Sequence, residues 1–166
     1  TQVDGPSLKR VVGPEIETFE MLEMEQRYQK ITAEQKQEVI DKCISKWNFL
    51  KEAKREGLEM AAGYYLAVKE ICDERGYDAI SLKDVDGMKK LLGFPPAPIF
   101  MLLSDEAKLC TIPENDCLGN ITQLMVKYLT GQCAAYLEFY EFFTDSVLAG
   151  VPDYVPAEIV DGDVTV

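Results

Sequence analysis

Two acidic residues near the middle of the chain could hold a metal ion or move a proton. Glu114 follows the short apolar run 109–112 and Pro113, and Glu138 lies at the end of the apolar, aromatic run 134–139. Each run predicts a β-strand, because β-compatible apolar residues are bounded there by loop signals. Carboxylates at strand ends can act as general bases or as oxygen ligands for a divalent cation. These two residues are therefore the candidate catalytic and metal-ligating groups.

The segment between these two runs predicts a helix. Asp116 can cap its first turn, apolar residues recur at helical spacing, and Gly131 suits the left-handed residue that ends a helix. If both strands belong to one parallel sheet, a right-handed crossover brings Glu114 and Glu138 to the same carboxyl-terminal edge. Open α/β sheets keep their ligand sites at that edge.

Both carboxylates also have a purely structural explanation. Glu114 could merely cap the helix that begins near Asp116, and Glu138 could lie at an exposed strand end, where single acids are common. The positions of the two acids alone favour this structural role. If the role is chemical, Glu141 is a weaker substitute for Glu138.

The order of these residues resembles the signature of the L-fucose and L-arabinose isomerase superfamily. In that family a Glu-x-Asp opens a helix that closes on Leu-Thr-Gly, and a further acid follows at the end of the next strand. The matching residues here are Pro113, Glu114, Asn115, Asp116, Gly119, Leu129, Thr130, Gly131 and Glu138, with Gly76, Asp78 and the segment 96–105 upstream. The resemblance reverses the preference and favours a chemical role for both glutamates.

The resemblance implies a metal-dependent aldose-ketose isomerase that works through an enediol. In the family two acids and a His from a later domain hold a Mn²⁺-type ion, which stabilises the enediolate as a Lewis acid. The acids also take part in proton transfer. The matching acids here are Glu114 and Glu138, whereas the chain contains no His, and residues 150–153 replace a turn that commonly bears one. The implied substrate is a small-molecule sugar, and Mn²⁺ would bind this chain only weakly.

The resemblance also implies a central domain that belongs to a larger chain. Residues 1–13 are expected to be a lead-in segment, and residues 14–166 a single α/β domain whose mostly parallel sheet is flanked by helices. The missing parts would be an N-terminal nucleotide-fold domain and a C-terminal β-barrel, and the parent would be a homo-oligomer. This chain alone is then expected to be inactive. The alternative is a non-catalytic sugar-binding or assembly module that keeps the fold.

Apolar residues at helical spacing, together with the Gly, Pro and capping residues that begin or end elements, predict the other helices and strands. Thr32 and Gln35 form a plausible capping box for the clearest helix. The run 99–103 is ambiguous between a strand and a buried helix, and the resemblance favours the helix. The remaining expected elements are a helix from Pro14 to about Lys30, an apolar helical face from Val39 to Leu50, a helix at 53–75 closed by Gly76, a strand at 77–82, a short helix at 85–92 capped by Asp84 and a strand at 147–149.

Composition excludes some partners. The formal charge of −12 disfavours nucleic acid, which draws its affinity from clustered Lys and Arg. No run is apolar enough for a membrane span, and residues 1–10 have no signal-peptide core. The five cysteines lack a CxxC pair, which predicts reduced, mostly buried thiols and a cytoplasmic protein.

Overall fold

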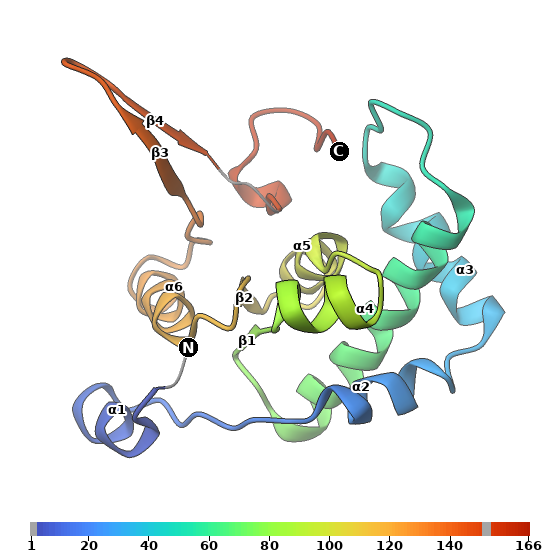
Figure 1. Ribbon diagram of the computed structural model, residues 1–166, viewed down its shortest axis with the longest axis horizontal. Coiled ribbons are helices and arrows are strands. Elements are labelled where there is room, and N and C mark those ends of the chain that lie inside the picture. The colour runs from blue at the N-terminus through green and yellow to red at the C-terminus, as the bar shows by residue number, and fades with distance from the viewer. Residues whose placement is uncertain (1–2, 151–153) are drawn as a thin grey trace.

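Helices pack around one small parallel sheet in this chain, and a second small sheet, a hairpin, extends away from them. The computed structural model describes residues 3–150 and 154–166. The helices are α1 (Gly5–Val12), α2 (Met21–Tyr28), α3 (Ala33–Lys42), α4 (Arg55–Arg75), α5 (Ala97–Asp105) and α6 (Cys117–Thr130), with a π-helix at Asp84–Lys89 and 3₁₀ turns at Ile44–Lys46 and Ala157–Ile159. The strands are β1 (Ala79–Ser81), β2 (Cys110–Ile112), β3 (Glu138–Phe142) and β4 (Val147–Gly150) (Figure 1).

Helix α4 forms the centre of the core, where it packs against α2, α3 and α5. Its middle carries small residues that let a neighbouring helix approach closely. A Cβ atom at Gly63 would lie 2.5 Å from a ring carbon of Tyr28, so no larger residue fits there without movement. Tyr28 in turn stacks on Tyr64, with ring centroids 4.1 Å apart. The small residues in the middle of α4 therefore serve helix packing.

Strands β1 and β2 form a two-stranded parallel sheet in which Ser81 pairs with Ile112. Helix α6 packs against both strands, and α5 packs against β2. The strands are only three residues long, and Thr111 in the middle of β2 is buried. The predicted combination of helices with parallel strands is therefore confirmed, but only as this short pair.

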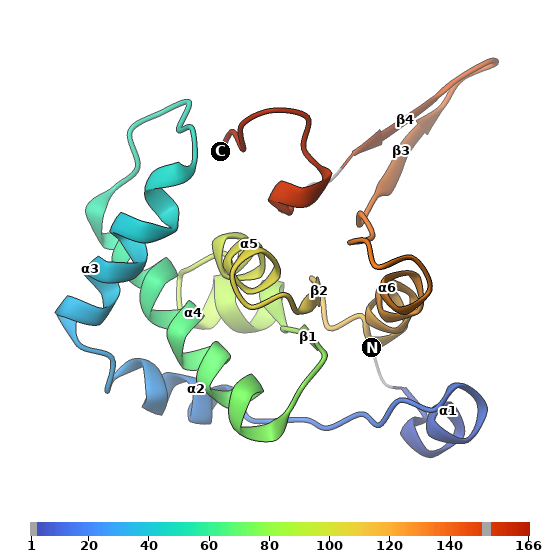
Figure 2. The same cartoon turned by 180° about the vertical axis from the view of Figure 1, so that it is seen from behind.

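The mostly parallel sheet is not found among the described residues, because β3 does not join β1 and β2. Strand β3 pairs antiparallel with β4, and residues 143–146 make a short connection between them. A short connection favours local hairpin pairing over a long crossover to a parallel neighbour. The hairpin extends away from the helices, as Figure 2 also shows. The predicted strand at 134–139 is thus displaced to Glu138–Phe142, while the strand predicted at 147–149 is confirmed.

Two predicted helices are shorter than expected. The segment 14–20 is not helical, because tertiary contacts replace helical ones: Glu17 pairs with Arg75 and Phe19 packs against the core. Helix α3 ends at Lys42 rather than continuing to Leu50. The chain there turns extended, and the amides of Asn48 and Leu50 donate to the carbonyl groups of residues 164 and 166.

Several local predictions are confirmed. Thr32 and Gln35 form the reciprocal capping box of α3, and Gly76 and Gly131 end α4 and α6 in left-handed conformations. Run 99–103 is helical, as part of α5. Residues 5–12 of the expected lead-in form helix α1, which buries no residue.

All five cysteines are free, with Cys72 and Cys110 buried and the others half-buried. Burial raises the pKa of the Cys72 thiol to about 12, which makes this thiol unreactive at neutral pH. Within the described part of the chain, no helix has the length and apolar character needed to cross a bilayer.

Candidate functional site

The carboxyl-terminal edge of the β1–β2 pair gathers polar residues from two segments. Two hydrogen bonds tie these segments together just beyond the strands. The amide of Asn115 donates to the carbonyl of Leu82 (3.0 Å), and the hydroxyl of Ser81 donates to the carbonyl of Pro113 (3.2 Å). The loop that carries Glu114 is therefore held through its own backbone groups, which bond to the carbonyl of Leu82 and the side chain of Ser81.

Glu114 and Asn115 both adopt left-handed backbone conformations, with φ angles of 63° and 57°. Asn tolerates this region because its short side chain bonds locally, but for Glu it costs about 1–2 kcal/mol. Such strain persists only where the surrounding structure imposes it, and it is frequent at functional sites. The side chain of Glu114 is exposed, so the strain presents a carboxylate to solvent at the sheet edge.

Asp116 caps helix α6, as predicted. Its Oδ1 atom accepts from the amides of Leu118 and Gly119, at 3.1 Å each. Gly119 is required for this geometry, since a Cβ atom there would lie 2.6 Å from the other oxygen of Asp116. The structural explanation for Glu114, that it caps this helix, is therefore not needed: Asp116 already does so.

Asp84 does not take the capping position predicted for it. Lys83 occupies that position, without a side-chain cap, and Asp84 is the first residue of the π-helix. The carboxylate of Asp84 is 2% exposed and lies 3.3 Å from the ammonium group of Lys89. This ion pair joins a buried carboxylate to an exposed lysine just beyond β1, on the segment that the Asn115 amide contacts. The sequence signal was an acid after a strand with a lysine five residues later.

Glu138 begins β3 and is half-buried, and it accepts a hydrogen bond from the hydroxyl of Tyr136 at 2.8 Å. The reasoning that placed it beside Glu114 required both strands in one parallel sheet, and that topology is wrong. Glu114 follows a strand of the parallel pair, whereas Glu138 begins a strand of the separate hairpin, and α6 lies between them in the chain. Their pairing stays a prediction that the strand order no longer supports.

Helix α6 carries two buried polar side chains that the sequence pattern did not single out. Oδ1 of Asn120 and Oε1 of Gln123 have no hydrogen-bond partner among the described residues. The amide nitrogen of Gln123 donates to the carbonyl of Ala134 at 3.0 Å, which ties the segment leading to β3 against α6. Tyr154 donates from its hydroxyl to the carbonyl of Thr111, and burial raises the pKa of this tyrosine.

These residues do not make a complete metal site. In residues 3–150 and 154–166, no group of three or more Cys, Asp or Glu side chains could hold an ion. Glu114 offers one exposed carboxylate, and Glu138 is on the hairpin. The His-bearing turn of the resembling family corresponds partly to residues 151–153, which lie outside the described residues. A Mn²⁺ ion would need ligands beyond those that the described residues bring together.

Comparison with known proteins identifies no relative: no protein-family model and no curated protein matches the chain.

Proposed function

We propose that this chain is part of a metal-dependent aldose-ketose isomerase of the L-fucose and L-arabinose isomerase type. It acts on a small-molecule sugar in the cytoplasm, with Glu114 and Glu138 as the acids that ligate Mn²⁺ and transfer protons. Further domains of a homo-oligomeric parent complete the site. The free thiols of all five cysteines are compatible with a reducing compartment.

The backbone of Glu114 is the observation that carries the proposal. It is an exposed glutamate in a left-handed conformation at the carboxyl-terminal edge of a parallel strand pair. Ligands of open α/β sheets bind at such edges. Because Asp116 already caps α6, the side chain of Glu114 is not needed as a helix cap. The left-handed turn at Glu114 and Asn115 joins β2 to α6 and leaves this carboxylate exposed.

The chain's own residues have a limited task in this chemistry. An exposed carboxylate at Glu114 can accept a proton from a sugar carbon or offer an oxygen to a cation. The hydrogen bonds from Asn115 and Ser81 fix the loop and so orient that carboxylate. A divalent ion, when bound, supplies Lewis-acid stabilisation of the enediolate oxygens. Glu138 can contribute only if the hairpin base comes close to this loop.

Titration with Mn²⁺, followed by the loss of the paramagnetic resonance signal of the free ion, tests the proposal. The wild-type chain should bind one ion with a dissociation constant of about 1 mM, as sites with few oxygen ligands do. Glu114→Gln and Glu138→Gln should each abolish this binding. Asp145→Asn is the matched control, because it removes the same charge from an exposed position in the connection of the same hairpin. Equal binding by all four proteins would show only diffuse attraction to an acidic surface and would refute the proposal.

The exposed hairpin favours a second candidate, a non-catalytic assembly module. Four large aromatic residues on or next to β3 are at least half exposed: Phe139, Tyr140, Phe142 and Phe143. Contiguous exposed apolar surface of this kind marks interaction sites. Under this alternative, Phe139→Ser with Phe142→Ser would abolish self-association in sedimentation experiments, while Glu114→Gln would change neither association nor metal binding.

A further inference from the structure

A cavity of about 500 Å³ lies between the start of α4, the segment leading into α5 and the C-terminal residues. Its floor consists of buried side chains, among them Ala61, Phe94, Met101 and Tyr154. Trp47 and Phe49 form a wall with ring centroids 6.4 Å apart. This volume lies within the range of small-molecule sites, and its lining is apolar and aromatic as such sites are.

The cavity exists because helix α4 presents small residues to it. Gly57 and Ala61 lie one turn apart on the same face of the helix, and both line the cavity. A Cβ atom added at Gly57 would have no atom within 4 Å, whereas one added at Gly63 on the same helix would collide with Tyr28. The glycine at 57 is therefore not needed for packing, and its missing side chain leaves space that nothing in the described chain fills.

Positive charge marks one end of this cavity. Lys54 carries the only charged side chain among the lining residues, and it has no ion-pair partner in the described part of the chain. It stands at the start of α4, whose first turn has no side-chain cap, so the partial positive charge of the helix amino end adds to that of the ammonium group. In a chain with a net charge of −12, this ammonium group beside an apolar cavity favours a ligand that carries an anionic group.

We propose that this cavity binds a small amphipathic carboxylate, with its aromatic or aliphatic body against Trp47 and Phe49 and its carboxylate at Lys54. The apolar lining supplies affinity through the area that it removes from water. The ammonium group and the amides of the first turn of α4 supply the preference for an anion. This site is separate from Glu114 and does not depend on the isomerase proposal.

Trp47 makes the test direct, because it is the only tryptophan of the chain and it lines the cavity. Its fluorescence is followed during titration with phenylbutyrate, phenylbutanol and phenylbutylamine, which share one hydrocarbon body and differ in charge. Phenylbutyrate should change the emission of Trp47, with half-saturation at about 1 mM or less. The alcohol should bind about fivefold more weakly, as expected for loss of one partly solvated charge contact, and the amine more weakly still.

Two variants separate the cavity from the rest of the surface. Gly57→Leu places a side chain in the open space and should reduce phenylbutyrate binding by more than about tenfold, while its Tm stays equal or rises because Leu favours a helix. Lys54→Met should reduce the preference of carboxylate over alcohol to what the amides of the first turn of α4 supply, and it should keep the binding of the alcohol. Lys51→Met, an exposed lysine outside the lining, is the matched control and should change neither.

Any of the following results would overturn the proposal: no change in Trp47 emission up to about 10 mM phenylbutyrate, equal binding of the acid and the amine, or unchanged binding by a folded Gly57→Leu protein. The last result would place the bound molecule elsewhere on the surface. Unchanged discrimination in Lys54→Met would likewise remove the basis for a carboxylate ligand.

Discussion

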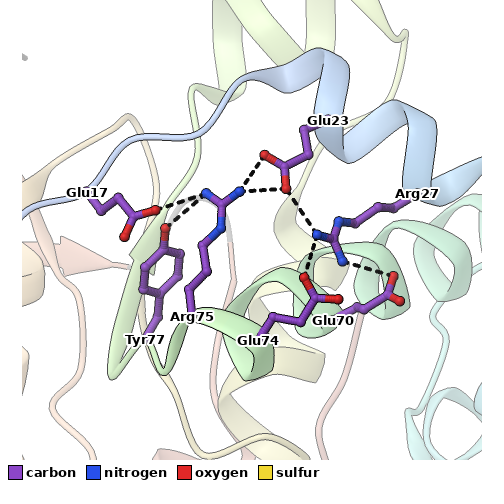
Figure 3. A network of polar contacts seen from close by, with 7 residues as sticks. All are labelled: Glu17, Glu23, Arg27, Glu70, Glu74, Arg75 and Tyr77. Atoms are coloured by element: carbon purple, nitrogen blue, oxygen red, sulfur yellow. Dashed lines mark hydrogen bonds and ion pairs between the residues drawn. The ribbon is translucent and has the colours of Figure 1, made fainter.

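Arg75 binds Glu23 through both carboxylate oxygens, each 2.7 Å from the same guanidinium nitrogen. The two residues lie 52 positions apart in the chain, at the end of α4 and the start of α2. Glu23 also pairs with Arg27, which reaches Glu70 and Glu74 on α4, and Arg75 further contacts Glu17 and Tyr77 (Figure 3). A network of this size fixes α2 and the segment before it on the end of α4, whereas isolated surface pairs contribute little.

Removal of Arg75 should therefore destabilise the fold more than removal of an isolated surface cation. We expect Arg75→Met to lower the Tm by about 2–4 °C in thermal unfolding followed by circular dichroism. The control is Lys42→Met, which breaks a single exposed pair with Glu38 and should leave the Tm nearly unchanged. Equal Tm values for the two variants would contradict a cooperative role of the network.

The same network predicts how stability changes in acid. Burial alone would raise the pKa of Glu23, but hydrogen bonds from Arg75 and Arg27 outweigh it and hold that pKa below 4.5. The hydrogen bond from Arg27 lowers the pKa of Glu74 in the same way. A carboxylate whose pKa is lower in the folded than in the unfolded state stabilises the fold above the unfolded value, and this contribution is lost as the pH falls through the folded value.

Unfolding measured from about pH 7 down to about pH 3 checks this expectation. The wild-type chain should lose more stability below pH 4.5 than a variant with Glu23→Gln and Glu74→Gln, since the variant has already lost these contributions. If the free energies of unfolding of the wild type and the double variant fell in parallel across this pH range, the two glutamates would not contribute to the loss of stability in acid.

The backbone of Glu114 predicts a conflict between stability and function. Glu114→Gly removes the cost of a left-handed glutamate, although part of that gain is offset by the greater freedom of Gly in the unfolded chain. The free energy of unfolding should rise by about 0.5–1 kcal/mol, while Mn²⁺ binding disappears. Glu141→Gly, at a position of β3 beside a register shift but outside the left-handed region, should lower stability. A destabilised Glu114→Gly protein would mean that the side chain of Glu114 contributes contacts to the fold.

Local signals predicted much of the fold because they are decided within a few residues. The capping box at Thr32, the cap at Asp116 and the terminal glycines at 76 and 131 all depend on neighbours in sequence. The position of β3 depended instead on a choice between two partners, β2 and β4, and apolar run length does not reveal which strand pairs with which. The end of α3 at Lys42 was set by the distant residues 164–166, which no local pattern could indicate.

The candidate site was predictable to a similar extent. Glu114 follows a parallel strand as expected, because Pro113 marks the end of β2 in the sequence. Its left-handed backbone, the burial of Asp84 and the cavity beside Trp47 required the tertiary structure. The proximity of Glu114 to Glu138 rested on a sheet topology that did not form, so the structure leaves that part of the site without support.

Enzymatic turnover tests whether catalysis by the proposed parent protein needs residues from its other domains. We expect no measurable isomerisation of L-fucose or L-arabinose by this chain with Mn²⁺, because it contains no His and its described residues bring together no complete metal site. Assays of ketose formation should match those of buffer with the ion alone. Turnover of about 1 per second or faster would show that the catalytic groups all lie within this chain.

Mapping the bound ion by nuclear magnetic resonance tests the central claim most directly. Substoichiometric Mn²⁺ added to nitrogen-labelled protein broadens the amide signals nearest to the ion. The proposed function predicts broadening concentrated on the amides of the Glu114 loop and the Glu138 end of β3, with its loss in Glu114→Gln. Broadening spread over the acidic surface, or centred on either region without the other, would contradict a shared metal site at these two glutamates.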